Sequence, residues 1–183
     1  MLLAVVVLLA ALALGRLGGG SLARLGGLPL DARRLGPIAL LVQLGGGLVG
    51  GPAYALGLAV SAALLGVFLL RNRGLRGTGL VALGLLSNAL VVGLNGAMPV
   101  TEAAAARAGI ATQDILTGAD PRHQPADDST RLRLLSDVIP VPWPVRPEVV
   151  SPGDVLVAAG LGQLVLIGMG ASVPTRSRRP VQA

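Results

Sequence analysis

Four long stretches of the chain carry no charged side chain, and they constrain its fold more than any other feature. They run over residues 1–15, 35–70, 77–101 and 155–175. An ionised side chain at the centre of a bilayer costs about 2.5 kcal/mol or more, so charge-free stretches are typical of membrane spans. Only 13% of the residues are charged, against roughly a quarter in soluble domains. The sequence therefore predicts an integral membrane protein.

The second stretch is too long for one span. As a single helix, residues 35–70 would measure about 54 Å, against a hydrocarbon core of about 30 Å. Gly50-Gly51-Pro52 in its middle favours a break and a helical hairpin. We therefore predict an all-α fold, with residues 1–183 as a single membrane domain. This domain is a helical bundle with spans at 1–15, 36–49, 53–70, 79–97 and 154–171.

The first span is a weak match to a removable signal peptide. Such a peptide carries basic residues before its apolar stretch and small residues at a cleavage site. Here no charge precedes the stretch, Arg16 and Arg24 follow it, and Ala11-Leu12-Ala13 matches a cleavage site poorly. We expect a retained anchor, with removal as the alternative.

The arginines predict how the spans are oriented. Segment 101–152 holds five Arg against seven Asp and Glu. Ten of the 15 basic residues lie in segments that a five-span chain places on the opposite side: Arg16, Arg24, Arg33, Arg34, Arg71, Arg73, Arg76, Arg176, Arg178 and Arg179. Basic loops stay in the cytoplasm. The N-terminus and segment 101–152 are thus expected outside a bacterial cytoplasmic membrane, and the tail 174–183 inside. Contact with anionic lipid then accounts for the net charge of +6, and no nucleic-acid partner is expected.

Two segments outside the spans have less regular patterns. In residues 16–35, leucines alternate with glycines and four Arg, which fits either an interfacial helical strip or a loose loop. In the outer segment, helices are predicted at Glu102–Ala108 and Thr130–Val138, and a loop over Gly118–Ser129. Pro140 to Pro147 favour an extended, polyproline-like return to the membrane. So few apolar residues cannot form a large core, so we expect this segment to pack on the outer ends of the spans.

Motifs for catalysis or cofactor binding are missing from the sequence. It contains no cysteine, phosphate loop, dinucleotide fingerprint, HExxH or nucleophile elbow. No Asp, Glu, Arg or His lies in the middle of a predicted span, which argues against a proton relay. We expect no cofactor and no bound metal.

Four amide side chains inside the predicted spans are candidate functional residues: Gln43, Asn88, Asn95 and Gln163. Asn88 and Asn95 are seven residues apart and therefore share one helix face. Buried amides on facing helices commonly hydrogen-bond each other and hold the helices together. A path for a solute or an ion is the alternative.

The outer segment offers a histidine and three carboxylates: His123, Asp120, Asp127 and Asp137. An imidazole near carboxylates can bind a metal or exchange protons. These residues lack helical spacing, so a solvated loop histidine is the first interpretation. Ser151-Pro152-Gly153-Asp154 precedes an apolar run and predicts a capping box, with Ser151 as N-cap and Asp154 reaching back to it.

Three short motifs in the sequence, taken together, resemble the pattern of a known family. They are Asn95-Gly-Ala-Met-Pro-Val100, Thr130-x-Leu-x-x-Leu-x-Asp137-x-Ile-Pro140, and Ser151-Pro-Gly-Asp154-Val-Leu, with a histidine before the second. In this order they resemble a bacterial family of small multi-spanning membrane proteins classed as a domain of unknown function. The resemblance covers most of residues 2–168. It implies a membrane location and brings no established activity.

These observations support three hypotheses. The first is a non-enzymatic scaffold or accessory protein, whose outer segment contacts another envelope protein or a second copy of the chain. The second is a small permease or channel lined by the four amides. The third is an enzyme at the membrane edge that uses His123 with Asp120, Asp127 or Asp137.

Overall fold

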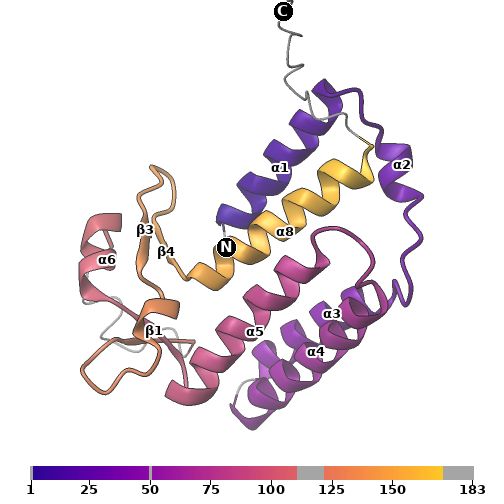
Figure 1. Ribbon diagram of the computed structural model, residues 1–183. Helices are drawn as coiled ribbons and strands as arrows, with labels where there is room; N and C mark the ends of the chain where they lie inside the picture. Colours follow the sequence, from indigo (N-terminus) through magenta and orange to yellow (C-terminus); the bar gives the residue numbers. More distant parts are fainter. Residues whose placement is uncertain (1, 50, 111–121, 171–183) are drawn as a thin grey trace, which may run out of the picture.

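The computed structural model describes residues 2–49, 51–110 and 122–170, and the fold is mostly helical (Figure 1). Helices occupy the positions of all five predicted spans, close to the predicted limits. They are α1 (Leu2–Leu17), α3 (Leu35–Val49), α4 (Gly51–Arg71), α5 (Thr78–Asn95) and α8 (Pro152–Gly168). The predicted tail 174–183 lies outside the described residues.

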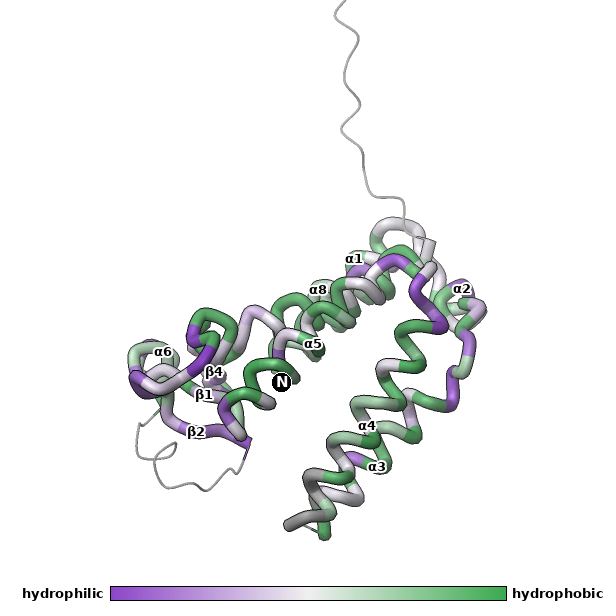
Figure 2. The backbone as a smooth tube through the Cα atoms, turned by 60° about the horizontal axis from the view of Figure 1, so that its bottom comes forward, coloured by the Kyte–Doolittle hydropathy of each residue, from purple (hydrophilic) through white to green (hydrophobic). Residues whose placement is uncertain are grey.

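Among the described helices, α5 is the one that is long and apolar enough to cross a membrane. The apolar stretches of the others are shorter: Leu2–Leu17, Leu35–Gly46, Ala59–Arg71 and Pro152–Gly168. Figure 2 shows mostly hydrophobic residues along the helices and hydrophilic residues in several of the connections between them. Five helices thus lie at the predicted positions, and among the described residues one of them meets the length and composition of a membrane span.

Helix α8 is the centre of a three-helix layer, with α1 on one side and α5 on the other (Figure 1). Glycines allow α5 and α8 to pack backbone to backbone. A Cβ added at Gly160 would lie 2.6 Å from the Gly77 carbonyl oxygen, and a Cβ at Gly84 would meet the Gly153 carbonyl oxygen. These pairs run in opposite directions along the chain, so α5 and α8 are antiparallel. On the other side, Gly162 of α8 faces Val7, and Met169 covers Gly15, so α1 is parallel to α8.

Helices α3 and α4 form the predicted hairpin. They contact each other along their length, and Gly57 of α4 packs against the backbone of Val42 and Gly46. Contacts between α4 and α5 are few, and the hairpin points away from the α1–α8–α5 layer (Figure 2). The described helices thus form a layer and a separate hairpin, and the single bundle that we predicted is not seen.

The connections at the arginine-rich end are held by one buried amide. Asn72, 4% exposed, donates from Nδ2 to the carbonyl oxygens of Asp31 and Phe68, both at 2.8 Å, and its Oδ1 accepts from the Asp31 N–H at 3.0 Å. The preceding segment contains a short helix α2 (Leu22–Gly26), capped by the Ser21 side chain. Residues 16–35 are therefore part helix and part loop.

The outer segment packs on the end of the layer where α5 finishes and α8 begins (Figure 1). It contains α6 (Glu102–Ala108), as predicted, with Gly109 in the left-handed conformation at its end. It also contains strands, which the all-α prediction missed: β1 (Met98–Val100) pairs in parallel with β2 (His123–Pro125), and β3 (Ile139–Val141) pairs antiparallel with β4 (Glu148–Val150). The β3–β4 hairpin replaces the polyproline-like return.

The predicted helix Thr130–Val138 is wrong. This segment contains a single 3₁₀ turn, η1 (Arg133–Leu135). Leu132 has φ = 54°, in the left-handed region that interrupts a helix. Asn95 also binds the backbone N–H of Arg131 through its side-chain oxygen, at 2.9 Å. The hydrogen bond from Arg131 to Asn95 and the left-handed backbone of Leu132 thus prevent the helix that the spacing of the leucines predicts.

Gly84→Ala is expected to destabilise the protein, because the new Cβ would meet the backbone of Gly153 and Val157, which cannot rotate away. Overpacking of this kind costs about 1–3 kcal/mol. The measurement is thermal unfolding of the purified protein in detergent, followed by circular dichroism.

Gly93→Ala in the same helix is the matched control, since nothing lies within 4 Å of its added Cβ. It should be neutral or stabilising by about 0.4–1 kcal/mol. Equal unfolding midpoints for the two variants would contradict the close α5–α8 contact.

Candidate functional site

A polar network joins α5 to the start of α8. Asn88 donates from Nδ2 to Asp154 Oδ1 at 2.8 Å, and its Oδ1 accepts from Ser151 Oγ at 2.9 Å. The predicted capping box is present: the Asp154 N–H donates to Ser151 Oγ at 3.0 Å, and the Ser151 N–H donates to Asp154 Oδ2 at 3.1 Å. Every polar atom of these three side chains has a partner within the network, so a structural role accounts for it.

The second amide of α5 holds the outer segment. Asn95 Oδ1 accepts from the Arg131 N–H, and its Nδ2 donates to the carbonyl oxygens of Arg131 at 3.0 Å and of Val91 at 2.8 Å. Gln124 of β2 donates to the Asn95 carbonyl oxygen at 3.1 Å. An open polar cleft lies beside these residues and extends to Asp127.

His123 and Asp137 lie close together in the outer segment. His123 is opposite Met98 in the β1–β2 register, while the Asp137 N–H donates to the Pro99 carbonyl oxygen at 3.0 Å. His123 Nε2 is 3.6 Å from Asp137 Oδ2. Strand β1 thus holds both residues, and β1 is itself part of the Asn95–Val100 patch that the sequence singled out.

Asp137 is the most perturbed titratable group of the outer segment. Its side chain is 5% exposed, and its Oδ1 has no hydrogen-bond partner among the described residues. Burial, and to a smaller extent the negative charge of Asp154, raises the pKa of Asp137 to about 8. At neutral pH this carboxyl group is therefore mostly protonated.

The other two carboxylates of the predicted set do not join this pair. Asp127 is exposed and closes a surface turn, where hydrogen bonds from Ser129 and then Thr130 lower its pKa. Asp120 lies outside the described residues. In the part of the chain that the structure describes, no three His, Asp or Glu side chains are placed to hold a metal ion.

The four amides do not converge. Gln43 is exposed on α3 and accepts a long hydrogen bond, 3.4 Å, from Ser61 of α4. Gln163 is exposed on α8. Asn88 and Asn95 contact the start of α8 and the outer segment, so no two of the four amides bond each other. Amide pairing between helices is therefore not observed.

Glu148 is a further structural residue that sequence reasoning missed. Its carboxylate accepts from the N–H groups of Leu2, at 2.6 Å, and Leu3, at 3.3 Å, and so caps α1 from strand β4. Burial alone would raise the pKa of Glu148, but these hydrogen bonds, led by that of Leu2, contribute to a net lowering. One feature of the sequence pointed to such a residue. The first turn of α1 has no acidic residue of its own, and a negative charge near a helix N-terminus is stabilising.

Comparison with known families gives one match. The model of a family of unknown function, DUF5317, matches residues 37–166. The chain belongs to this family. Asn88, Asn95, His123, Asp137 and Ser151 all lie inside the DUF5317 region. No curated protein and no solved structure matches the chain.

The raised pKa of Asp137 predicts that the protein loses stability as the pH rises. The folded state holds this proton more tightly than the unfolded state, whose carboxyl group titrates near 3.8. The stabilisation is therefore complete below about pH 4 and is lost as the pH rises through about 8. Asp137→Asn should remove the loss, making the variant more stable than the wild type at pH 9, on the order of a few kcal/mol. Unfolding midpoints at pH 5 and pH 9 measure this.

Asp127→Asn is the control for this DUF5317 protein. Asp127 is exposed and ionised in both states between pH 5 and pH 9, so its pH profile should follow the wild type. A wild type equally stable at pH 5 and pH 9 would contradict the buried, protonated Asp137.

Proposed function

We propose that this DUF5317 protein is an integral membrane protein and acts as a non-enzymatic scaffold or accessory protein. Helices α1, α3, α4, α5 and α8 would cross the bilayer, and segment 101–152 would present a folded surface outside the cytoplasm. One observation carries the membrane placement: large apolar side chains are exposed along these helices, while the charged ones lie at the helix ends.

The exposed apolar surface is unusual for a protein in water. Leu41 and Leu48 of α3 are 67% and 90% exposed, and Leu86 of α5 is 68% exposed. Within the five helices, charge is confined to Arg16, Arg71 and Asp154, each in a first or last turn. Soluble monomers rarely expose continuous apolar faces of this kind, whereas lipid covers them without cost.

The arrangement of the helix ends supports the proposed orientation. The starts of α1 and α8 lie together, because Glu148 binds the first N–H groups of α1 and Ser151 caps α8. Both therefore lie beside the outer segment. The last turns of α1 and α4 and the connections at this other end carry one acidic residue, Asp31, and seven arginines: Arg16, Arg24, Arg33, Arg34, Arg71, Arg73 and Arg76. This asymmetry favours the arginine-rich end as the cytoplasmic one.

Helix lengths are consistent with a thin or locally thinned bilayer. At 1.5 Å per residue, α5 is about 27 Å long and α3 about 22 Å. A short span is accommodated by thinning of the bilayer or by snorkelling of flanking residues, at a modest cost per ångström. Arg34 before α3 and Arg71 at the end of α4 are placed to snorkel.

The scaffold role rests on the outer surface. Leu134 and Val145 of the outer segment are 83% and 93% exposed, although neither lies on a span. Apolar side chains presented in this way fit an interface with another envelope protein or a second copy. A permease is less favoured, because the four amides are dispersed. An enzyme is less favoured, because the exposed Asp127 closes a surface turn and does not join His123 and Asp137.

A photo-reactive benzophenone amino acid at Leu134 should yield one discrete adduct with an envelope protein. Irradiated membranes are washed in alkaline carbonate, the chain is captured, and the adduct is identified by mass spectrometry. The same amino acid at Asp128, in an exposed polar turn, is the control and should give none. Loss of the chain in the carbonate wash, or equal adducts from both positions, would refute the proposal; an adduct of twice the chain mass would make the partner a second copy.

A further inference from the structure

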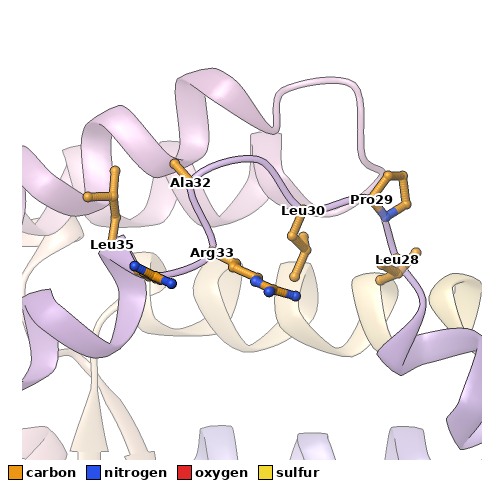
Figure 3. Close-up of a pocket in the computed structure, with 7 residues that line it drawn as sticks. Leu28, Pro29, Leu30, Ala32, Arg33 and Leu35 are labelled. Atoms are coloured by element: carbon orange, nitrogen blue, oxygen red, sulfur yellow. The ribbon is translucent and has the colours of Figure 1, made fainter.

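The loop between α2 and α3 forms an open cleft at the arginine-rich end of the protein (Figure 3). Three leucines, Leu28, Leu30 and Leu35, supply its apolar lining, and two neighbouring arginines, Arg33 and Arg34, supply its charge. In Figure 3 the side chains of Leu28, Leu30 and Arg33 all extend from the same side of the loop. The cleft therefore combines cationic and apolar surface within eight residues.

The loop is held in a defined shape. The buried amide of Asn72 forms two hydrogen bonds to the backbone of Asp31, one donated to its carbonyl oxygen and one accepted from its N–H. The next residue, Ala32, has φ = 53°, in the left-handed region that is unfavourable for alanine by roughly 1 kcal/mol. A fixed backbone with local strain is typical of a binding loop more than of a passive connection.

Both arginines of the cleft are available to a ligand. Their side chains are exposed, and neither guanidinium group forms an ion pair or a hydrogen bond with another described residue. Arg24, by contrast, donates to the carbonyl oxygens of Gly170 and Gly19. Two unpaired guanidinium groups in sequence can bind phosphate oxygens in the bidentate manner that arginine favours.

We propose that this cleft binds the headgroup phosphate of an anionic phospholipid of the inner leaflet. Arg33 and Arg34 contact the phosphate, and the leucines contact the start of an acyl chain. The inference rests on the membrane placement proposed above, which puts this end of the protein at the cytoplasmic surface. Basic clefts between helices on that side are suited to anionic headgroups.

The leucines favour a lipid over a soluble anion. A free phosphate or carboxylate would use the arginines and leave Leu28, Leu30 and Leu35 uncovered. A phospholipid covers both kinds of surface in one molecule, and seven arginines at this end attract the anionic lipid into the neighbourhood.

The test uses the full chain in detergent, titrated with phosphatidylglycerol or phosphatidylcholine, with bound lipid counted by native mass spectrometry. The wild type should prefer phosphatidylglycerol. Arg33→Gln/Arg34→Gln should weaken phosphatidylglycerol binding about 30-fold, which corresponds to about 1 kcal/mol for each arginine. Arg73→Gln/Arg76→Gln, an equal change of charge on exposed residues of the neighbouring connection, should remain within about twofold of the wild type.

Equal weakening by the two double variants would overturn the proposal in favour of diffuse attraction. Displacement of the lipid by millimolar inorganic phosphate would assign the cleft to a soluble anion and also overturn it. Retention in carbonate-washed membranes is measured in parallel. A retained wild type with no lipid preference refutes the cleft alone, whereas loss of the wild type from the membrane refutes the proposed function.

Discussion

The contact between α5 and α8 is the interaction on which the rest of the structure depends. Glycines at positions 77, 84, 153 and 160 remove the side chains that would otherwise separate the two helices. Because the helices pack closely, the side chain of Asn88 on α5 hydrogen-bonds both Ser151 and Asp154. These two residues cap α8, so the same side chains cap this helix and link it to α5. Small residues and interhelical amides are the means by which helices associate in lipid, where apolar burial gives no net attraction.

This contact also fixes the outer segment. Because α5 ends where α8 begins, the chain that joins them must fold over that end, and Asn95 binds its backbone at Arg131. Strand β1 continues directly from α5 and orders His123 on one side and Asp137 on the other. The third helix is attached at the same end through Glu148, which caps α1. The buried Asp137 is therefore positioned by β1, which follows directly from α5.

Local features of the fold could be predicted from the sequence, and features set by distant residues could not. The division of the long apolar stretch into α3 and α4 and the Ser151–Asp154 cap were predicted from residues within a few positions of each other, and both are present. Strands β1 and β3 are three residues long and each contains a proline, so they exist only through their partners. The Asn88–Asp154 bond joins residues 66 positions apart, and no pattern in one sequence reports such a pairing. The helix predicted over Thr130–Val138 does not form, because the side chain of Asn95, 36 positions away, bonds the backbone N–H and carbonyl oxygen of Arg131.

The central claim is that lipid surrounds the exposed apolar faces, with the arginines on the inner side and the polar segment outside. The chain contains no cysteine, so one introduced thiol reports its own position without background. Asp128→Cys in the outer turn and Arg73→Cys after α4 are both at exposed positions. In intact cells, a membrane-impermeant maleimide should label Asp128→Cys and should label Arg73→Cys only after permeabilisation. Equal labelling of the two variants in intact cells, or labelling of Arg73→Cys alone, would contradict the account.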